Sequence, residues 1–387
     1  MEVYDFILFE NYFLATNHYK DICIIAKLLK RCGYSVAIAD VFGEGDHCIV
    51  EDVSHIKFTK KCPVPITEYS SRFGLLKGLV NTYRRMRIAS YLKYVLLQLQ
   101  GKYRHLYAGS YYSRMSTKWL GMIPSNSSAF FWGLRSSRLI EHELCPHGRT
   151  AVSSRRLRSY FDKHQNLKFF VSDEIIRKEF LDLVLSPLRL VIRPERIIDE
   201  LPCPPENKHA GLNLLSIGSI RESKRIEMIL DCLKELGDAD IHYIIAGKAS
   251  SEYNEIIAEH SKGMYNVKRL DYRIPDSEYD TLLEQCDFLV LCDKKQKSSV
   301  TNGTMNEALQ KGVPIIAPDY NPYKYYIEKY GVGLVFDPSK PQSLANAITE
   351  AKKRGRASYY DSICKYDETY LWDRVVQQFK KELSKSL

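Results

Sequence analysis

The strongest constraint on the fold is a regular alternation of short apolar runs and longer amphipathic runs between residues 212 and 356. The apolar runs have the length and composition of buried strands, and the amphipathic runs have helical periodicity. Strands are predicted at 212–217, 241–246, 267–270, 288–291, 314–317 and 333–336, and helices near 222–236, 251–260, 276–285, 302–310, 322–329 and 342–354. This alternation predicts a doubly wound parallel sheet, in which ligands bind beyond the carboxyl ends of the strands.

The first half of the chain predicts a second sheet of the same α/β class. An alternating run at 3–9, an amphipathic run at 18–31 that ends before Gly33, and a run at 34–39 form a strand, helix, strand unit. Further strands are expected at 105–109, 128–132 and 168–171, and further helices near 75–100 and 173–183.

The boundary between the two domains is expected in the proline-rich, charged stretch 194–211. It separates an N-terminal Rossmann-like domain at 1–193 from a C-terminal one at 212–356, which suits a chain of 387 residues because one domain takes ~100–200. The amphipathic tail at 357–387 is expected to pack back on the N-terminal domain as a helix, since its apolar stripe would otherwise be exposed.

The charge of the chain is unevenly distributed. Residues 51–158 hold 19 lysines and arginines against 5 acidic residues, although the whole chain carries a net charge of only +9. This basic region, with Arg84, Arg85, Arg87 and Lys93 among tyrosines and Leu92, suits an anionic membrane, an acidic glycan or a merely solvated surface. No nucleic-acid-binding signature occurs, so nucleic acid is not an expected partner.

The expected cellular location and metal content of the protein are predicted from sequence motifs that do not occur in the chain. No apolar run approaches the ~18 residues of a spanning helix, and the acidic start is unlike a secretory signal, so a cytoplasmic protein is expected, with contact at the inner face of the plasma membrane through 51–158. No C-x-x-C and no paired Cys/His spacing occurs, and the segment of Arg221 and Lys224 has no Asp-x-Asp pair, so no metal and no cofactor are expected.

The most informative motif is the polar turn Thr301-Asn302-Gly303-Thr304, which leads into a predicted helix. The unpaired N–H groups of a helix start bind anions, and a diphosphate fits that description. Glu307 lies one turn further on, where its carboxylate could accept hydrogen bonds from a ribose diol. The alternative is a capped helix with a solvent-facing glutamate.

A basic pair marks the first turn of the same domain. Arg221 and Lys224 follow Gly218 at the end of the first strand and are three residues apart, so they can converge on one anion. Cations in a first helical turn are unfavourable against the helix dipole unless an anion is bound. Fixed cations at this place would stabilise the charge that develops on a leaving diphosphate, without a metal.

These segments together resemble the donor domain of the GT-B-fold glycosyltransferases, in particular the family-4-like (group 1) enzymes that build bacterial polysaccharides. The four matching pieces follow one another in order: Gly218 with Arg221 and Lys224; Ile244-Ile-Ala-Gly247-Lys248; the segment from Tyr279 to Asp287-Phe-Leu-Val; and Glu307-Ala-Leu-x-x-Gly312-x-Pro314. The resemblance implies two Rossmann-like domains facing a cleft. It further implies a UDP- or GDP-sugar bound by Gly218, Gly247, Asn302, Gly303, Thr304 and Glu307.

One departure from the family pattern concerns the donor sugar. The family shows two glutamates eight positions apart, and Ser299 stands where the first is expected. Ser299, Thr301 and Asn302 could supply weaker hydrogen bonds to the sugar. A retaining hexosyltransferase is the expectation from the resemblance, and this departure leaves the donor sugar and the stereochemical outcome open.

His18 is the candidate catalytic base. It stands with Asn17 where the first strand gives way to the first helix, and histidine has a pKa suited to removing a proton from a sugar hydroxyl. It resembles the acceptor-side histidine of several GT-B enzymes, but the glycine pair common in that loop is missing. The alternative is a helix-start or core histidine; the loop Pro146-His147-Gly148-Arg149 is a weaker second candidate.

The sequence therefore predicts a glycosyltransferase that moves a sugar from a nucleotide-sugar to a glycan or lipid-linked acceptor in bacterial surface polysaccharide synthesis. The alternative is a non-catalytic GT-B-like partner, or a glycan- or nucleotide-binding subunit of a glycosyltransferase complex. A dinucleotide-dependent dehydrogenase is disfavoured because no G-x-G-x-x-G follows any strand.

Overall fold

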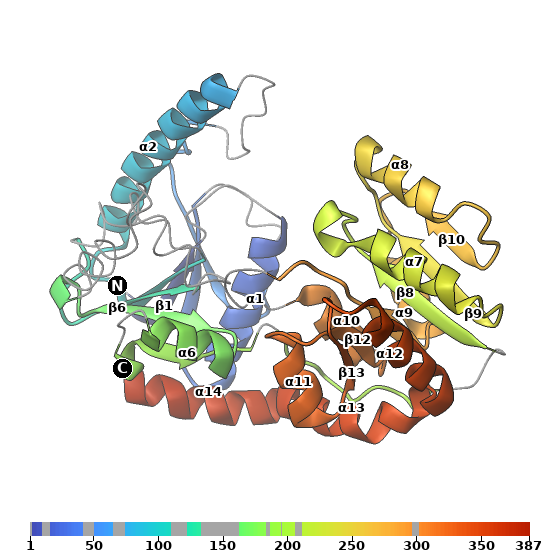
Figure 1. Ribbon diagram of the computed structural model, residues 1–387. Coiled ribbons are helices and arrows are strands. Elements are labelled where there is room, and N and C mark those ends of the chain that lie inside the picture. Colours follow the sequence, from blue (N-terminus) through green and yellow to red (C-terminus); the bar gives the residue numbers. More distant parts are fainter. Residues whose placement is uncertain are drawn as a thin grey trace. The chain divides into compact units, whose positions relative to one another are not determined.

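The computed structural model describes residues 2–9, 16–41, 50–64, 74–109, 122–132, 162–182, 186–194, 196–205, 211–295 and 302–387. For residues 16–20, 74–78, 85, 89 and 182 it describes the backbone alone. The chain divides into two compact units (Figure 1): unit 1 comprises Met1–Glu195 and Val375–Leu387, and unit 2 comprises Arg196–Arg374.

Unit 1 contains a parallel sheet with the strand order β3-β2-β1-β4-β5-β6-β7. Its strands are β1 (Tyr4–Phe9), β2 (Val36–Asp40), β3 (Ser54–Lys57), β4 (Tyr103–Ala108), β5 (Ser128–Trp132), β6 (Leu167–Val171) and β7 (Leu190–Ile192). The edge strands β3 and β7 were not predicted. They have only four and three residues, too short for a strand periodicity to stand out.

Helices cover both faces of this sheet. Helices α2 (Gly74–Leu99) and α6 (Glu174–Asp182) bury Ile88, Val95 and Phe180 against one face. Helix α1 (Thr16–Arg31) packs beside β1 and β2, and Phe170 on the same face stacks edge-on against Phe379 of α14 (Trp372–Ser386), 5.4 Å between ring centroids. The end of the chain is therefore part of unit 1 from Val375 onward, whereas α13 (Tyr360–Asp367) belongs to unit 2.

Unit 2 contains a second parallel sheet, with the order β10-β9-β8-β11-β12-β13. Its strands are β8 (Leu212–Ile217), β9 (Ile241–Ala246), β10 (Val267–Leu270), β11 (Phe288–Val290), β12 (Ile315–Pro318) and β13 (Gly333–Phe336). Its helices are α7 (Ile226–Leu236), α8 (Ser251–His260), α9 (Asp276–Gln285), α10 (Gly303–Gln310), α11 (Tyr323–Tyr330) and α12 (Pro341–Arg354). Both sheets have the doubly wound α/β form expected, and in unit 2 the strand order reverses between β8 and β11.

One predicted helix is divided in two. Instead of a single helix over 222–236, a short 3-10 helix, η3 (Glu222–Lys224), precedes α7, and Arg225 between them has a left-handed backbone with φ 47°. The side chain of Arg225 explains the break, because its Nε donates to the carbonyl oxygen of Cys292 at 2.7 Å, just after β11. A contact with a residue so distant in sequence cannot be read from local periodicity.

Candidate functional site

The turn after β8 brings three of the predicted donor-site residues together. Gly218 has φ +100°, and a Cβ atom built on it would lie 3.6 Å from Oγ1 of Thr304 and 3.7 Å from Nζ of Lys224. Because Gly218 has no side chain, its backbone is accessible in the space between the ammonium group of Lys224 and the start of α10. This place is the carboxyl edge of β8 and β11, where the strand order reverses and a doubly wound sheet binds its ligands.

Lys224 presents an ammonium group that the described residues satisfy only in part. Its Nζ donates to the carbonyl oxygen of Ile217 at 2.7 Å, and no described carboxylate forms an ion pair with it. Burial lowers the pKa of Lys224, an effect that the charge of Asp293 opposes and that of Arg221 reinforces. An ammonium has three donors, so two remain for an anion.

Arg221 lies on the exposed side of the same turn. Its Nε donates to Oγ of Ser219 at 3.0 Å, and the residue stands at the N-cap of η3. Beside it, a cavity of about 320 Å³ opens between η3 and α8, and Lys248 and Tyr253 also line it. Nζ of Lys248 is already paired with Asp271 at 3.3 Å, whereas no described carboxylate forms an ion pair with Arg221 or Lys224.

Gly247 shapes the site through its backbone. It has φ +143°, and a Cβ atom there would lie 1.8 Å from the carbonyl oxygen of Gly218. The turn of Gly218 is thereby packed directly on the end of β9, where the N–H of Gly218 donates to the carbonyl of Ala246 at 3.0 Å. Any larger residue at Gly247 would displace the turn that carries Gly218.

Asn302 is the N-cap of α10, and its side chain is engaged by neighbouring groups. Oδ1 accepts from the N–H of Met305 at 3.2 Å, while Nδ2 donates to the hydroxyl of Tyr323 at 2.8 Å. Tyr323 in turn donates to Oδ2 of Asp293 at 2.9 Å. Asn302 therefore holds the helix start in place, and the N–H groups of Gly303 and Thr304, which have no acceptor within the helix, are what the helix offers to an anion.

Glu307 is exposed one turn further along α10. Its Oε2 accepts from the hydroxyl of Tyr279 on α9 at 2.5 Å, and burial together with this carboxylate raises the pKa of Tyr279. The described part of the chain makes no other hydrogen bond or ion pair with the Glu307 side chain, so Oε1 remains able to accept from hydroxyl groups of a ligand. Tyr279 begins one of the motif segments, yet nothing in the motif indicated its contact with Glu307.

Several predicted residues cannot be placed with the others. Ser299, Thr301 and the loop at 146–149 lie outside the described residues. His18 is in the first turns of α1, where the backbone alone is described. Three residues of the candidate site were not predicted, because no local sequence signal marks them. Asp293 follows β11, Arg225 lies between η3 and α7, and Tyr323 begins α11.

None of the described helices is both long and apolar enough to cross a membrane. The described side chains also contain no group of three or more His, Cys, Asp or Glu residues arranged to hold a metal ion.

The chain resembles known proteins in a family model and in overall fold. Residues 204–364 match the family described as glycosyl transferases group 1. Among solved structures, HepE from Anabaena in complex with UDP and glucose aligns with a TM-score of 0.60 at 12% identity, covering 98% of this chain and 99% of that chain. Sucrose-phosphate synthase from Thermosynechococcus elongatus aligns at 0.66 and 13%, covering 98% of each chain.

A third similar structure is WaaG, a glycosyltransferase involved in lipopolysaccharide biosynthesis, with a TM-score of 0.60 at 15% identity over 97% of this chain and 98% of that chain. No curated protein gives a significant sequence match. These likenesses show the GT-B fold, and they cover both units of the chain.

Proposed function

We propose that this chain transfers a sugar from a nucleotide-sugar to a saccharide or lipid-linked acceptor in bacterial surface polysaccharide synthesis. Residues 204–364 match the group 1 glycosyltransferases, and the two units have the GT-B fold, which supports this proposal. The observation that carries the proposal is the convergence of Lys224 and Thr304 on the open backbone of Gly218. A diphosphate placed there would meet an ammonium group and the N–H groups of a helix start.

The nucleoside end of the donor would lie toward Glu307. Its carboxylate, oriented by Tyr279, has an oxygen available for a ribose diol one helical turn from the diphosphate site. The donor is a UDP- or GDP-sugar in this proposal. HepE, which shares the fold, was solved with UDP and glucose, and that supports a nucleotide-sugar of this class.

The reaction needs little beyond binding and charge stabilisation. The bond between the anomeric carbon and the phosphate oxygen breaks, a bond from the acceptor oxygen forms, and the acceptor proton passes to a base, for which His18 is the candidate. The nucleoside diphosphate leaves with one more negative charge. Lys224 and Arg221 would stabilise that charge, and electrostatic stabilisation of this kind accounts for most of the rate enhancement in many enzymes. A retaining, hexosyl-transferring outcome is part of the proposal.

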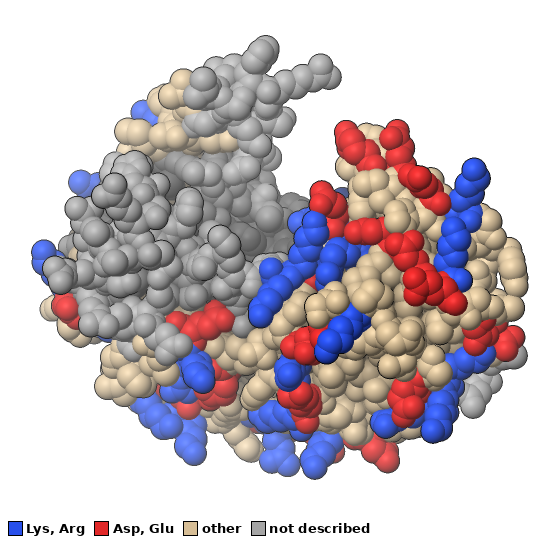
Figure 2. Space-filling view, viewed as in Figure 1, with Lys and Arg blue, Asp and Glu red and all other residues tan. Residues whose placement is uncertain are grey.

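The acceptor would be reached at the cytoplasmic face of an anionic membrane through the basic region 51–158. Within it, Arg87 and Lys93 are exposed on α2, and Leu79 and Met86 on the same helix are 70% and 55% exposed. Tyr91 and Leu92, which the sequence placed with the basic residues, are instead buried in the core at 4% and 1% exposure. On the face of unit 2 seen in Figure 2, acidic and basic side chains are interspersed, so no single sign of charge dominates there.

The proposal is tested by incubating the purified chain with UDP-glucose and other UDP- and GDP-sugars and measuring release of the nucleoside diphosphate. A thermal-shift screen with the same donors identifies the nucleotide, because a ligand that binds only the folded state raises the melting temperature. We expect one donor class to raise the melting temperature and to be slowly hydrolysed, and Lys224→Met to lose both effects.

The second candidate is a non-catalytic GT-B-like subunit, which the serine at position 299 favours. Such a subunit would bind a nucleotide or glycan without turnover. Binding of a donor with no detectable hydrolysis or transfer at high enzyme concentration would support this candidate over an active transferase.

A further inference from the structure

Helix α10 is held from outside by two arginines that donate to backbone carbonyl groups. Arg196, only 8% exposed, donates from Nη1 to the carbonyl oxygen of Asn306 at 2.9 Å, in the middle of the helix. Arg356 donates from Nη2 to the carbonyl of Lys311 at 2.6 Å and from Nε to that of Gly312 at 3.1 Å, at the C-terminal end. Neither arginine is part of the predicted donor site.

The direction of Arg196 is fixed by its surroundings. Its Nη2 donates to the carboxylate of Asp367, which is fully buried on α13. The guanidinium group lies over the rings of Tyr370 and Tyr366, at 4.5 and 5.1 Å from their centroids. Held by an anion and two aromatic faces, the guanidinium presents Nη1 to α10 in one orientation.

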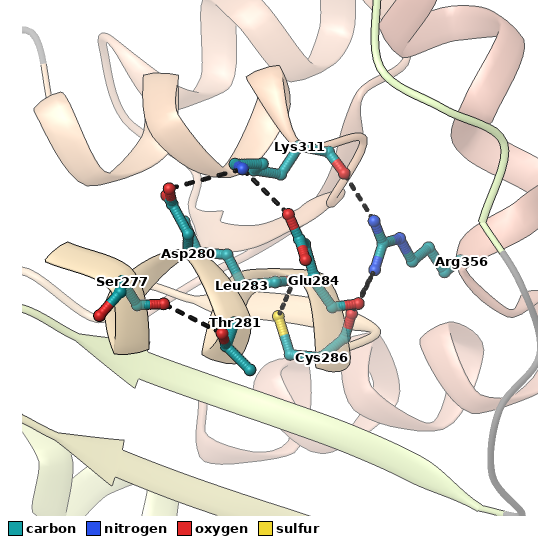
Figure 3. Close-up of polar contacts among 8 residues, drawn as sticks. All are labelled: Ser277, Asp280, Thr281, Leu283, Glu284, Cys286, Lys311 and Arg356. Atoms are coloured by element: carbon teal, nitrogen blue, oxygen red, sulfur yellow. Dashed lines mark hydrogen bonds and ion pairs between the residues drawn. The ribbon is translucent and has the colours of Figure 1, made fainter.

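Arg356 ties α10 to α9 (Figure 3). Its Nη1 donates to the carbonyl oxygens of Glu284 and Cys286, each at 2.9 Å, at the end of α9. The same arginine thus bridges the C-terminal ends of both helices. The ammonium of Lys311 reinforces this junction, because it contacts Glu284 at 3.0 Å and Asp280 at 3.7 Å on α9.

These contacts decide where the start of α10 lies. A helix of eight residues is marginal on its own, so its position depends on contacts with the rest of the unit. Arg356 bonds the carbonyl groups of Lys311 and Gly312, the two residues that follow the helix directly, and so fixes the position of its C-terminal end. A rotation or a shift of the helix along its axis would break the bonds to Asn306 and Lys311 and would move Thr304 and Glu307 by the same amount.

We propose that Arg196 and Arg356 are positioning residues that fix the rotation and axial position of α10, so that its N-terminus and Glu307 face the nucleotide. The identity of that ligand rests on the function proposed above, whereas the clamp itself does not. Both arginines act through the backbone of α10, and no contact of either with the ligand is required.

The test uses Arg196→Lys and Arg356→Lys in the full chain. Lysine keeps the positive charge beside Asp367 and at the helix ends, but its ammonium group lacks the planar fork with which a guanidinium bonds two or more acceptors in fixed directions. Asp238→Asn is the matched control, because it removes an ion pair with Lys352 of 2.6 Å elsewhere in unit 2. Amide hydrogen exchange is followed in α10 and, for global stability, in β8, and the dissociation constants of UDP and GDP are measured.

In both lysine variants we expect the amide exchange rate in α10 to rise about tenfold and the rate in β8 to stay unchanged. The dissociation constant of the bound nucleotide should rise by about the same factor, because loss of one hydrogen bond to a charged group has an effect of about this size. The control should change neither. Unchanged exchange in α10, or faster exchange with unaltered nucleotide affinity, overturns the proposal. If the wild type binds neither nucleotide, the proposed function fails, and exchange in α10 alone then decides whether the two arginines clamp the helix.

Discussion

The hydroxyl of Tyr279 donates a hydrogen bond of 2.5 Å to Oε2 of Glu307, which joins α9 to α10 at the predicted ribose site. We expect Glu307→Ala to weaken nucleotide binding by roughly 1–3 kcal/mol, since hydrogen bonds to charged groups are of that order. Tyr279→Phe keeps the carboxylate of Glu307 but removes the hydrogen bond that orients it, so this variant should weaken nucleotide binding less than Glu307→Ala does. Isothermal titration of UDP and GDP measures both. Equal binding by wild type and Glu307→Ala would remove Glu307 from the site.

Lys224 should account for much of the affinity for the diphosphate. We expect Lys224→Met to weaken nucleoside diphosphate binding about 10- to 100-fold, whereas Lys248→Met, whose ammonium is already paired with Asp271, should change it less than about threefold. A nucleoside without phosphates separates the causes, because its affinity should be the same in all three proteins. If Lys248→Met were the more damaging change, the diphosphate would lie on the other side of η3.

The pH dependence of binding gives a second test of the same lysine. Burial lowers the pKa of Lys224, so its ammonium is lost at a lower pH than that of an exposed lysine. Nucleotide affinity should therefore fall as the pH rises, and the fall should begin below the ordinary lysine range. Titrations between pH 7 and 10 should show this decline in the wild type and a flat profile in Lys224→Met. A wild-type profile as flat as that of the variant would show that Lys224 does not contact the ligand.

Much of the unit 2 fold could be predicted because its elements are locally encoded. The strands β8, β9, β10 and β13 have the predicted bounds, and the polar turn before Glu307 marked the start of α10. The site residues that escaped prediction depend on contacts across the sheet. Arg225 takes a left-handed backbone to reach Cys292, and Asp293 holds Tyr323, each through a partner that lies 30 or more positions away.

Gly247 and Gly303 have the same predicted role, but the structure gives them different surroundings that the sequence does not indicate. Both were predicted as donor-binding glycines, but a Cβ atom at Gly247 would collide with the backbone of Gly218, whereas nothing lies within 4 Å of one at Gly303. We expect Gly247→Ala to lower the melting temperature clearly and Gly303→Ala to leave it nearly unchanged. Differential scanning fluorimetry measures this difference. Loss of nucleotide binding by the stable Gly303→Ala variant would show a ligand close to that backbone.

Asp367 should make the stability of the protein depend on pH. Burial raises the pKa of Asp367 to about 6 from the ordinary value of 3.8, although Arg196 opposes this shift. Burial also raises the pKa values of Tyr366 and Tyr370, so these tyrosines stay neutral in this range. A carboxyl group with a raised pKa stabilises the fold fully below about pH 4, and this contribution is lost as the pH rises through 6.

Asp367→Asn removes that titration. Relative to the variant, the wild type should therefore lose up to about 3 kcal/mol of unfolding free energy between pH 4 and pH 7, since one pKa unit corresponds to about 1.4 kcal/mol. Urea unfolding of both proteins at several pH values measures the difference. A difference that stays constant over this range, or that grows in the opposite direction, would contradict the raised pKa of Asp367.

The outer side of α2 should bind anionic membranes. Leu79, Tyr83 and Met86 are spaced by four and three residues, so they share one face of the helix, and all three are more than half exposed. Arg87 and Lys93 are exposed on the same helix, and each cation near an anionic leaflet contributes on the order of 1 kcal/mol. Insertion of apolar side chains and attraction of charges would then act together, which makes binding reversible and sensitive to salt.

Liposome flotation with vesicles of phosphatidylcholine alone or mixed with phosphatidylglycerol tests this surface. We expect flotation with the anionic vesicles at low salt, release at 1 M salt because the Debye length falls to ~3 Å, and loss of binding in Arg87→Glu/Lys93→Glu. Leu79→Ser/Met86→Ser should weaken binding at every salt concentration, and charge reversal of Lys353 on α12 serves as the control. Binding to the neutral vesicles alone, or binding that survives both high salt and charge reversal on α2, would show that the basic region serves an acidic acceptor glycan or solubility instead.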